Sequence, residues 1–190
     1  MDAVNVDLKA FTERFYWKIC GGHLDPVLET LLYLRQETQA WLELTTLVIS
    51  GENDSDEEID SMTQWIAANL GNEVPLHFTA FHPDWKMLDT AATSGHTLTR
   101  CREIALKNGL EFVYTGNVYD PHGASTWCPG CDGVLIERAG YTLGQWNIAI
   151  SDRQAVCADC GYAIAGVFEE RPGTWGSRRQ PVYIESQAAT

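Results

Sequence analysis

The order of apolar and polar positions over residues 1–117 predicts strands and helices that alternate along the chain. Strand-forming residues gather in four short segments, at residues 2–8, 41–49, 75–81 and 110–115. Apolar residues recur at helical spacing between them, at residues 25–38, 55–70 and 93–108. Because the connections are short, this order predicts right-handed crossovers and an α/β fold with a parallel sheet.

The ends of the expected helices carry local signals of their own. Asp25 is expected to cap the first helix, with Pro26 at its first helical position. Ser55 and Glu58 form a capping-box pattern at the start of the second helix, and Gly71 suits its exit. These signals indicate where the helices begin and end.

The character of the sequence changes after Asn117, where turn residues increase and helical periodicity disappears. We therefore expect a first domain at residues 1–117, a small module at 118–170 and a loosely attached tail at 171–190. Within the tail, residues 180–184 have the composition of an added edge strand.

Charge and composition restrict the partners and the compartment. The chain has 26 acidic and 13 basic residues, a net charge of −13, which repels phosphate backbones and argues against nucleic-acid binding. The sequence contains no apolar run of about 18 residues, so no membrane span is predicted. The N-terminus has no basic segment followed by an apolar one, which argues against secretion and favours the cytoplasm. Six cysteines in a cytoplasmic protein fit four metal ligands and two free thiols better than three disulfides.

Two Cys-x-x-Cys pairs in the second module predict a metal site. Residues 132–156 separate the pairs, and short strands at 134–137, 141–143 and 146–150 would make this a zinc ribbon with a long hairpin. A site of four thiolates is closed to substrate, so zinc would be structural. A rubredoxin-like iron site and redox-active dithiols are the alternatives. The expected ligands are Cys128, Cys131, Cys157 and Cys160.

Polar residues follow each of the four expected strands of the first domain. In parallel α/β sheets, ligands bind beyond the carboxyl ends of the strands. Taken singly, each such residue is weak support for a site, because an Asp or Lys there is usually solvated and Asn53-Asp54 could merely start a helix. Together they predict a site on one rim, formed by Asp7-Leu8-Lys9, residues 50–54, residues 81–84 and Thr115-Gly116-Asn117.

Five segments, in this order, give the sequence a resemblance to a known family. They are Asn5 to Phe11, Leu47 to Asp54, His77 to Asp84, Val113 to Val118 and the Cys128-Pro129-Gly130-Cys131 pair. The sequence resembles radical S-adenosylmethionine (SAM) enzymes over about residues 1–170. The nearest group is similar to pyruvate formate-lyase activating enzymes, specifically the radical SAM member of the AmmeMemoRadiSam system.

The resemblance implies a fold and a SAM site. The first domain would be the C-terminal half of a partial (β/α)6 TIM-like barrel, followed by a small β zinc ribbon. Asp7 and Lys9 match the strand-end pair near the methionyl part of SAM, and His82 matches the residue near its adenosyl part. A lysine suits the methionine carboxylate, and a histidine can stack on the nucleoside or hydrogen-bond to it.

One departure from the family's pattern is central. The Cys-x3-Cys-x2-Cys motif that holds a [4Fe–4S] cluster is absent, and Ser50 replaces the usual proline before glycine. The chain is therefore interpreted as a C-terminal fragment, inactive alone, for which a truncated gene model or an internal start at Met1 would account. The complete enzyme would cleave SAM at its cluster and generate a 5′-deoxyadenosyl radical, which would act on an unknown substrate such as a protein glycyl site.

Three other interpretations remain open. The chain could be a non-catalytic, zinc-binding scaffold, a half-barrel that assembles with another chain. It could be one part of a split enzyme whose missing N-terminal, cluster-bearing half is a separate polypeptide. A zinc-ribbon nucleic-acid factor would need a basic face, against which the net charge counts. Under the fragment interpretation, the first strand is expected to leave an unpaired edge.

Overall fold

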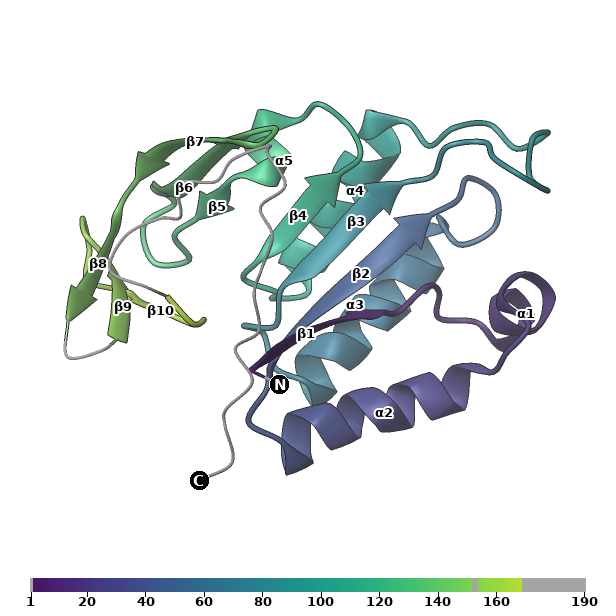
Figure 1. The fold of residues 1–190 in the computed structure, drawn as a ribbon, viewed down its shortest axis with the longest axis horizontal. Coiled ribbons are helices and arrows are strands. Elements are labelled where there is room, and N and C mark those ends of the chain that lie inside the picture. Colours follow the sequence, from purple (N-terminus) through teal and green to yellow (C-terminus); the bar gives the residue numbers. More distant parts are fainter. Residues whose placement is uncertain (1, 152–153, 169–190) are drawn as a thin grey trace, which may run out of the picture.

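A four-stranded parallel sheet organises the first part of the molecule in the computed structural model, which describes residues 2–151 and 154–168. Helices α2, α3 and α4 connect successive strands and lie along one face of the sheet (Figure 1). The strands, in spatial order, are β1 (Ala3–Asp7), β2 (Trp41–Val48), β3 (Leu76–Ala80) and β4 (Val113–Gly116). The helices are α2 (Leu24–Glu37), α3 (Asp56–Asn69) and α4 (Gly95–Lys107). The predicted alternation and the parallel sheet are confirmed.

The segment between β1 and α2 contains structure that the periodicity did not indicate. A short helix α1 (Glu13–Phe15) continues into a π-helix (Tyr16–Cys20), which ends at Gly21 with a left-handed φ of 68°. Helix α2 then begins at Leu24, so the prediction that Asp25 caps it is wrong. The Glu13 carboxylate accepts a hydrogen bond from the Leu24 amide at 2.9 Å and takes over the role of the cap.

The start of α3 shows half of the predicted capping box. The Ser55 hydroxyl accepts a hydrogen bond from the Glu58 amide at 3.2 Å, as expected. The Glu58 carboxylate does not return to Ser55 but accepts a hydrogen bond from the Phe11 amide at 2.7 Å. Glu58 therefore ties the start of α3 to the segment that follows β1.

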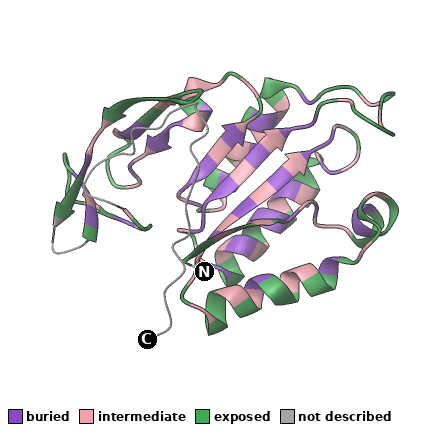
Figure 2. Cartoon of the chain, viewed as in Figure 1, coloured by how far each residue is buried: buried purple, intermediate pink, exposed green. Residues whose placement is uncertain are grey.

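The two faces of the parallel sheet differ in character. Along β2, the side chains that point to the helices are buried and those that point away are half-buried, in strict alternation (Figure 2). Leu42, Leu44 and Val48 join the main apolar core on the helix face. The other face carries Glu43 and Thr45 on β2, and Asn5, His77 and Tyr114 on neighbouring strands. This face is polar, whereas parallel sheets are usually covered on both sides by apolar contacts.

The second part of the molecule is antiparallel and lies beside β4 (Figure 1). It contains a short helix α5 (Pro121–Ala124) and two three-stranded sheets, in the orders β5-β6-β7 and β10-β9-β8. Its apolar cluster includes Phe112, just before β4, so the ribbon rests on the edge of the parallel sheet. The strands are β5 (Thr126–Trp127), β6 (Val134–Ala139), β7 (Thr142–Trp146), β8 (Ile148–Ser151), β9 (Gln154–Cys157) and β10 (Ala163–Ile164).

Some expectations about the architecture stay predictions, and others fall outside the described residues. Within the described residues, β1 and β4 are the edges of the parallel sheet, and its closure into a partial barrel stays a prediction. The boundary at residue 118 also stays a prediction. The expected edge strand at 180–184 and the tail at 171–190 lie outside the described residues. Among the helices that the structure describes, none has the length and apolar character needed to span a membrane.

Candidate functional site

The four paired cysteines come together in the ribbon, as the sequence predicted. Their sulfur atoms all lie within 4.8 Å of one another. The Sγ atoms of Cys128 and Cys160 are 3.6 Å apart, and those of Cys131 and Cys157 are 3.9 Å apart. A tetrahedral zinc ion with Zn–S distances of about 2.3 Å requires sulfur separations of about 3.8 Å. The arrangement therefore fits a four-thiolate metal site.

Each cysteine pair lies on a tight turn. The Asp132 amide donates to the Cys128 carbonyl at 2.9 Å, and the Gly161 amide donates to the Cys157 carbonyl at the same distance. Gly161 has a φ of 76°, a left-handed conformation that glycine adopts without a steric penalty. A Cβ on Gly130 would approach the Tyr162 ring to 2.7 Å, so this turn also requires glycine.

Backbone groups favour the thiolate form on the second turn. Hydrogen bonds from the amides of Cys160 and Asp159 lower the pKa of Cys157 to about 7. Burial raises the pKa of Cys128 to about 12, so this thiol would be deprotonated only when a cation binds. Cys128 and Cys157 are buried while Cys131 and Cys160 are exposed, which places the site at the ribbon surface.

The two remaining cysteines belong to no such cluster. Cys101 is buried in the main core, and this burial raises the pKa of its thiol to about 12. Cys20 is exposed at the end of the π-helix, and partial desolvation raises the pKa of its thiol. Neither thiol is activated as a nucleophile, in agreement with the sequence interpretation.

The rim at the carboxyl ends of the parallel strands brings the first two predicted SAM ligands together. The Lys9 ammonium lies 3.0 Å from the Asp7 carboxylate just beyond β1, and both side chains are accessible. His82 follows β3 on the same rim, with β2 between it and β1, and its side chain is exposed. In the described chain, His82 makes no side-chain hydrogen bond, so its ring is free to contact a ligand.

Three side chains fasten this rim, of which Asn53 and Asn117 were predicted from the sequence to lie on it, whereas Thr93 was not singled out. The Asn53 amide donates to the Lys9 carbonyl at 2.6 Å, and its oxygen accepts from the Ile49 amide at 2.7 Å. The Thr93 hydroxyl donates to the Val48 carbonyl at 2.5 Å. The Asn117 amide, on a residue with a φ of 59°, donates to the Ala80 carbonyl at 3.2 Å. Each strand end is thus bound to the segment that follows the next strand.

Asn53 and Asn117 show how a structural role can underlie a functional pattern. Both lie in segments that carry the family resemblance, yet each side chain is used inside the protein. Asn53 does more than start a helix, because it is almost fully buried between two strand ends. The sequence showed only that a polar residue follows each strand. It did not show which backbone group across the rim that residue would bind.

Tyr16 of the π-helix is a second residue missed by the sequence interpretation. Its hydroxyl accepts a hydrogen bond from the Lys9 amide at 3.1 Å. Burial raises the pKa of Tyr16, so it stays a neutral phenol. Because π-helical segments are frequent at functional sites, this placement beside Lys9 supports a role of the rim in binding.

The polar face of the sheet carries a connected set of side chains toward the amino-terminal halves of β2, β3 and β4. His77 Nε2 lies 3.0 Å from the Glu43 carboxylate, and the His77 ring stacks on Tyr114 with centroids 4.9 Å apart. The hydrogen bond with His77 is the main cause that lowers the pKa of Glu43. Thr45 donates to the Asn5 side chain at 2.9 Å. This face can offer charge and hydrogen bonds to a polar ligand.

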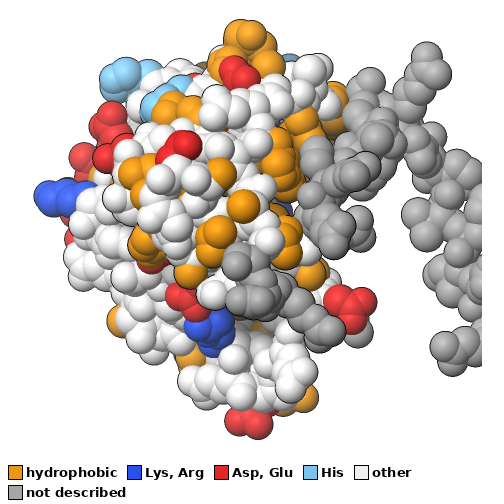
Figure 3. All heavy atoms as spheres, turned by 90° about the vertical axis from the view of Figure 1, so that its left-hand side faces the viewer, with side chains coloured by type: hydrophobic (Ala, Val, Ile, Leu, Met, Phe, Trp, Pro, Cys, Tyr) orange, Lys and Arg blue, Asp and Glu red, His pale blue; other side chains and the backbone are white. Residues whose placement is uncertain are grey.

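The ribbon side of the molecule has the opposite character. Apolar side chains are exposed there, and lysine and arginine are sparse in this view (Figure 3). Tyr141, Leu143 and Ile150 are among the exposed apolar residues. The described residues in this view form no basic patch of the kind that a nucleic-acid-binding ribbon would need.

Comparisons with known proteins give a sequence relative and a fold neighbour. The chain is 37% identical over 164 residues to an uncharacterized protein of Methanocaldococcus jannaschii, a match that covers 86% of this chain and 48% of that protein. The chain therefore spans about half the length of the curated relative that it matches. No family model matches the sequence.

The fold neighbour is a solved domain of pyruvate-formate lyase-activating enzyme from Bacteroides vulgatus. The two structures superimpose with a TM-score of 0.53 at 16% identity, over 61% of this chain and 68% of the other. At this identity, the comparison establishes a shared fold. It agrees with the fold expected from the resemblance, whereas the narrower AmmeMemoRadiSam assignment stays a prediction.

Proposed function

We propose that this chain is the C-terminal portion of a radical SAM enzyme of the activating type and that its strand-end rim binds SAM. Lys9 would hold the methionine carboxylate, Asp7 the methionine ammonium, and His82 would contact the adenosyl group. The observation that carries the proposal is that four of the five segments resembling the family end together on one rim of a parallel sheet. The likeness in fold to a domain of pyruvate-formate lyase-activating enzyme supports it.

The electrostatics of the rim suit a zwitterionic ligand. Lys9 and Asp7 present opposite charges 3.0 Å apart, and both are solvent-accessible. The amino and carboxylate groups of the methionyl part can exchange with this ion pair, because an exposed pair contributes little to stability and is readily rearranged. Tyr16 and Asn53 hold the backbone on both sides of Lys9 and thereby fix the position of its Cα.

The open polar face provides a place for the substrate of such an enzyme. Glu43, His77 and Tyr114 lie in the amino-terminal halves of the strands whose carboxyl ends form the rim, so a substrate that contacts them and bound SAM would have to extend along the strands. Substrate identity would follow from hydrogen bonds to these side chains. A protein glycyl segment is the class of substrate that the resemblance suggests.

The cluster chemistry of the family does not fit the residues of this chain. A [4Fe–4S] cluster supplies the electron that cleaves SAM, and it needs three closely spaced cysteines. The described four-cysteine centre is closed, and Cys20 and Cys101 are isolated in the sequence. We therefore assign SAM binding to this chain and propose that a separate, cluster-bearing half supplies the redox chemistry.

We also propose that the ribbon metal is a structural zinc. Among the described residues, the apolar cluster of the ribbon has eight buried members, including Phe112 and the ligands Cys128 and Cys157, and this small size favours stabilisation by a metal. Four thiolates leave no open position for a substrate, so zinc here would act on stability and not on catalysis. A mononuclear iron in the same site would give a coloured protein and would contradict this assignment.

Isothermal titration of SAM into the zinc-loaded chain tests the proposal. Lys9→Ala is expected to weaken SAM binding by about tenfold, because a hydrogen bond to a charged group is lost. His82→Ala is expected to weaken it by a few-fold through lost contact with the nucleoside. Lys107→Ala, which removes a charge from the far end of α4, serves as the matched control and should leave the affinity unchanged.

The result can also reject the proposal. If SAM binds equally to the wild type, Lys9→Ala and His82→Ala, the rim is not the SAM site. If no saturable binding occurs, the zinc-bearing scaffold becomes the better description of this chain. Circular dichroism of each variant separates a lost ligand contact from a lost fold.

A further inference from the structure

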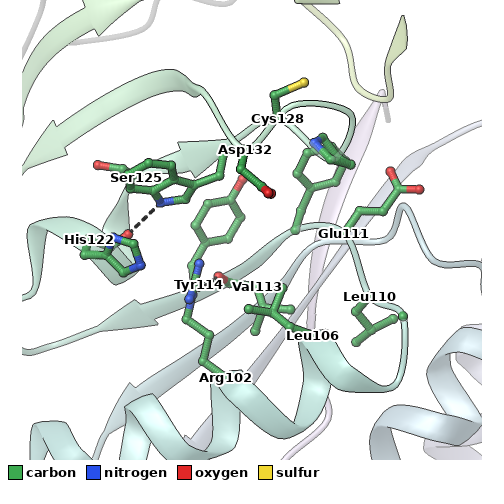
Figure 4. Close-up of a pocket in the computed structure, with 14 residues that line it drawn as sticks. Arg102, Leu106, Leu110, Glu111, Val113, Tyr114, His122, Ser125, Cys128 and Asp132 are labelled. Atoms are coloured by element: carbon green, nitrogen blue, oxygen red, sulfur yellow. Dashed lines mark hydrogen bonds between the residues drawn. The ribbon is translucent and has the colours of Figure 1, made fainter. Parts of the chain in front are cut away.

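A cavity of about 460 Å³ lies between α4, the edge strand β4 and the ribbon, away from the strand-end rim (Figure 4). Its volume is in the range of small-molecule sites, and its walls combine aromatic and apolar residues with a few charged groups. It is independent of the proposed SAM site, because its lining includes none of Asp7, Lys9 and His82.

Arg102 is the charged group that α4 contributes to this cavity. Its Nε donates to the Val113 carbonyl at 2.9 Å, which fixes the plane of the guanidinium and caps an outward carbonyl of β4. Among the described residues, no carboxylate forms an ion pair with Arg102, whereas Arg14, Arg35 and Arg100 all have acidic partners. The two terminal nitrogens therefore offer donors in a fork that suits a carboxylate.

The arginine is only partly accessible, which makes its lack of an acidic partner informative. Burial lowers the pKa of the Arg102 guanidinium, in a chain with twice as many acids as bases. Asp120 is close enough to raise this pKa but forms no ion pair with Arg102, so a bound anion that contacts the guanidinium would recover part of its desolvation cost. In Figure 4 the side chain reaches from α4 toward Tyr114 at the centre of the cavity.

Acidic groups come from other elements of the same cavity. Glu111, before β4, accepts a hydrogen bond from the Tyr162 hydroxyl through one carboxylate oxygen, and its other oxygen is available to a ligand. Asp132 lies on the turn of the first cysteine pair and is exposed. These carboxylates would repel a polyanion such as a nucleotide. They would attract the amino group of a ligand whose carboxylate is held by Arg102.

The remaining walls favour a flat apolar body. The Trp127 indole donates to the His122 carbonyl at 3.0 Å and lies against the His122 ring, with centroids 4.6 Å apart. Phe112 and Tyr114 line the side formed by β4. Such preorganised rings bind a planar group without ordering new side chains.

We propose that this cavity binds a small zwitterion with a flat apolar part, of the kind represented by an aromatic amino acid. The ligand's carboxylate binds Arg102, its ammonium group faces Glu111 and Asp132, and its ring packs on Trp127 and Phe112. The site joins the parallel sheet to the ribbon, so occupancy stabilises the contact between them.

Three probes that differ only in their charged groups test this inference on the full zinc-loaded chain. They are L-phenylalanine, 3-phenylpropanoate, which lacks the amine, and 2-phenylethylamine, which lacks the acid. The readout is the nuclear magnetic resonance (NMR) signal of the Trp127 indole N–H, identified by its loss in Trp127→Phe. L-phenylalanine is expected to give a saturable shift at a lower concentration than either single-charge probe.

Two variants locate the binding. Arg102→Gln is expected to weaken L-phenylalanine binding by at least about tenfold, since a charge-assisted hydrogen bond is lost, whereas Lys107→Gln on the same helix leaves it unchanged. Leu106→Trp fills the cavity from the α4 surface without removing a polar contact and is expected to abolish binding, even if Arg102→Gln fails to fold. Equal binding of the amine and the amino acid, unchanged binding to Leu106→Trp, or no saturable shift with any probe would overturn the proposal.

Discussion

Asn53 illustrates, at the scale of single residues, how a buried amide can hold a binding rim. It is 2% exposed and uses both ends of its side chain, toward the Ile49 amide and toward the Lys9 and Leu47 carbonyls. Because buried polar groups that lose a partner carry a full desolvation penalty, the contact between the ends of β1 and β2 is expected to depend strongly on Asn53.

Replacement of Asn53 tests that dependence. Asn53→Ala is expected to lower the free energy of unfolding by roughly 2–4 kcal/mol, because three backbone groups lose their partner. Asn69→Ala, at an exposed position of α3, is the matched control and should change it by less than about 0.5 kcal/mol. Urea denaturation of both variants measures the difference, and equal midpoints would show that the rim is held by other contacts.

The Glu43–His77 pair predicts a dependence of stability on pH. The pKa of Glu43 is lowered from 4.5, chiefly by the hydrogen bond with His77, so the folded state holds this carboxylate ionised more strongly than the unfolded state does. Its contribution is therefore present above pH 4.5 and is lost as pH falls through the lowered pKa. In Glu43→Gln, stability should fall less steeply between about pH 5 and 3 than in the wild type.

A control distinguishes this pair from acid effects elsewhere. Glu29→Gln removes an exposed carboxylate of α2 and should leave the slope unchanged. Any loss of metal at low pH affects all three proteins alike, so the difference between the curves isolates Glu43. Identical slopes for the wild type and Glu43→Gln would show that the pair contributes nothing to stability.

At the scale of elements, a side-chain cap stabilises the start of α3, the helix that follows β2. Ser55→Ala is expected to cost about 1 kcal/mol, because the Glu58 amide loses its side-chain acceptor. Ser61→Ala, in the exposed interior of the same helix, should be neutral or slightly stabilising, since alanine favours helices. Thermal unfolding compares them, and equal melting temperatures would contradict the capping role.

The ribbon is the element whose fold is expected to depend on metal. Cys157→Ser should reduce metal content from about one ion per chain and expose the amides of β8, β9 and β10 to hydrogen exchange. Cys20→Ser, at an exposed thiol outside the cluster, should leave both unchanged. Elemental analysis with hydrogen exchange measures the two effects. Full protection of the ribbon in metal-free Cys157→Ser would contradict a structural metal.

The elements were also the scale at which sequence patterns were most informative. Periodicity located β1 to β4 and the three long helices because each has one buried face that repeats at a regular interval. The paired cysteines located the metal site because their spacing alone specifies two turns. The π-helix and the capping role of Glu13 were missed, because the π-helix is only five residues long and Glu13 caps α2 from 11 residues upstream, so neither follows an apolar repeat.

Prediction of the site from the sequence was limited because several of its contacts join different strands and their following segments. Asp7, Lys9 and His82 could be placed on one rim because parallel strands end on the same side. Asn53, Thr93 and Tyr16 could not be assigned, since their partners are backbone groups of other strands. Phe112 belongs in sequence to the first unit but packs with the ribbon cluster, which no local pattern revealed.

The whole molecule places a polar sheet face and a strand-end rim beside a ribbon with four clustered cysteines. The helices cover one face of the parallel sheet (Figure 1), and ribbon residues Thr126 and Arg138 contact Tyr114 on the other. The fold shared with a domain of pyruvate-formate lyase-activating enzyme agrees with this arrangement. The central claim is therefore spatial, namely that SAM binds across the carboxyl ends of β1, β2 and β3.

An NMR titration with SAM, followed at the backbone amides of the zinc-loaded chain, tests this claim most directly. The account predicts saturable shifts at residues 7–9, 50–54 and 82–84, with little change at residues 126–164 of the ribbon. The same titration of Lys9→Ala should need a higher SAM concentration. Shifts confined to the ribbon, or none at high SAM concentration, would contradict the assignment of this rim as the SAM site.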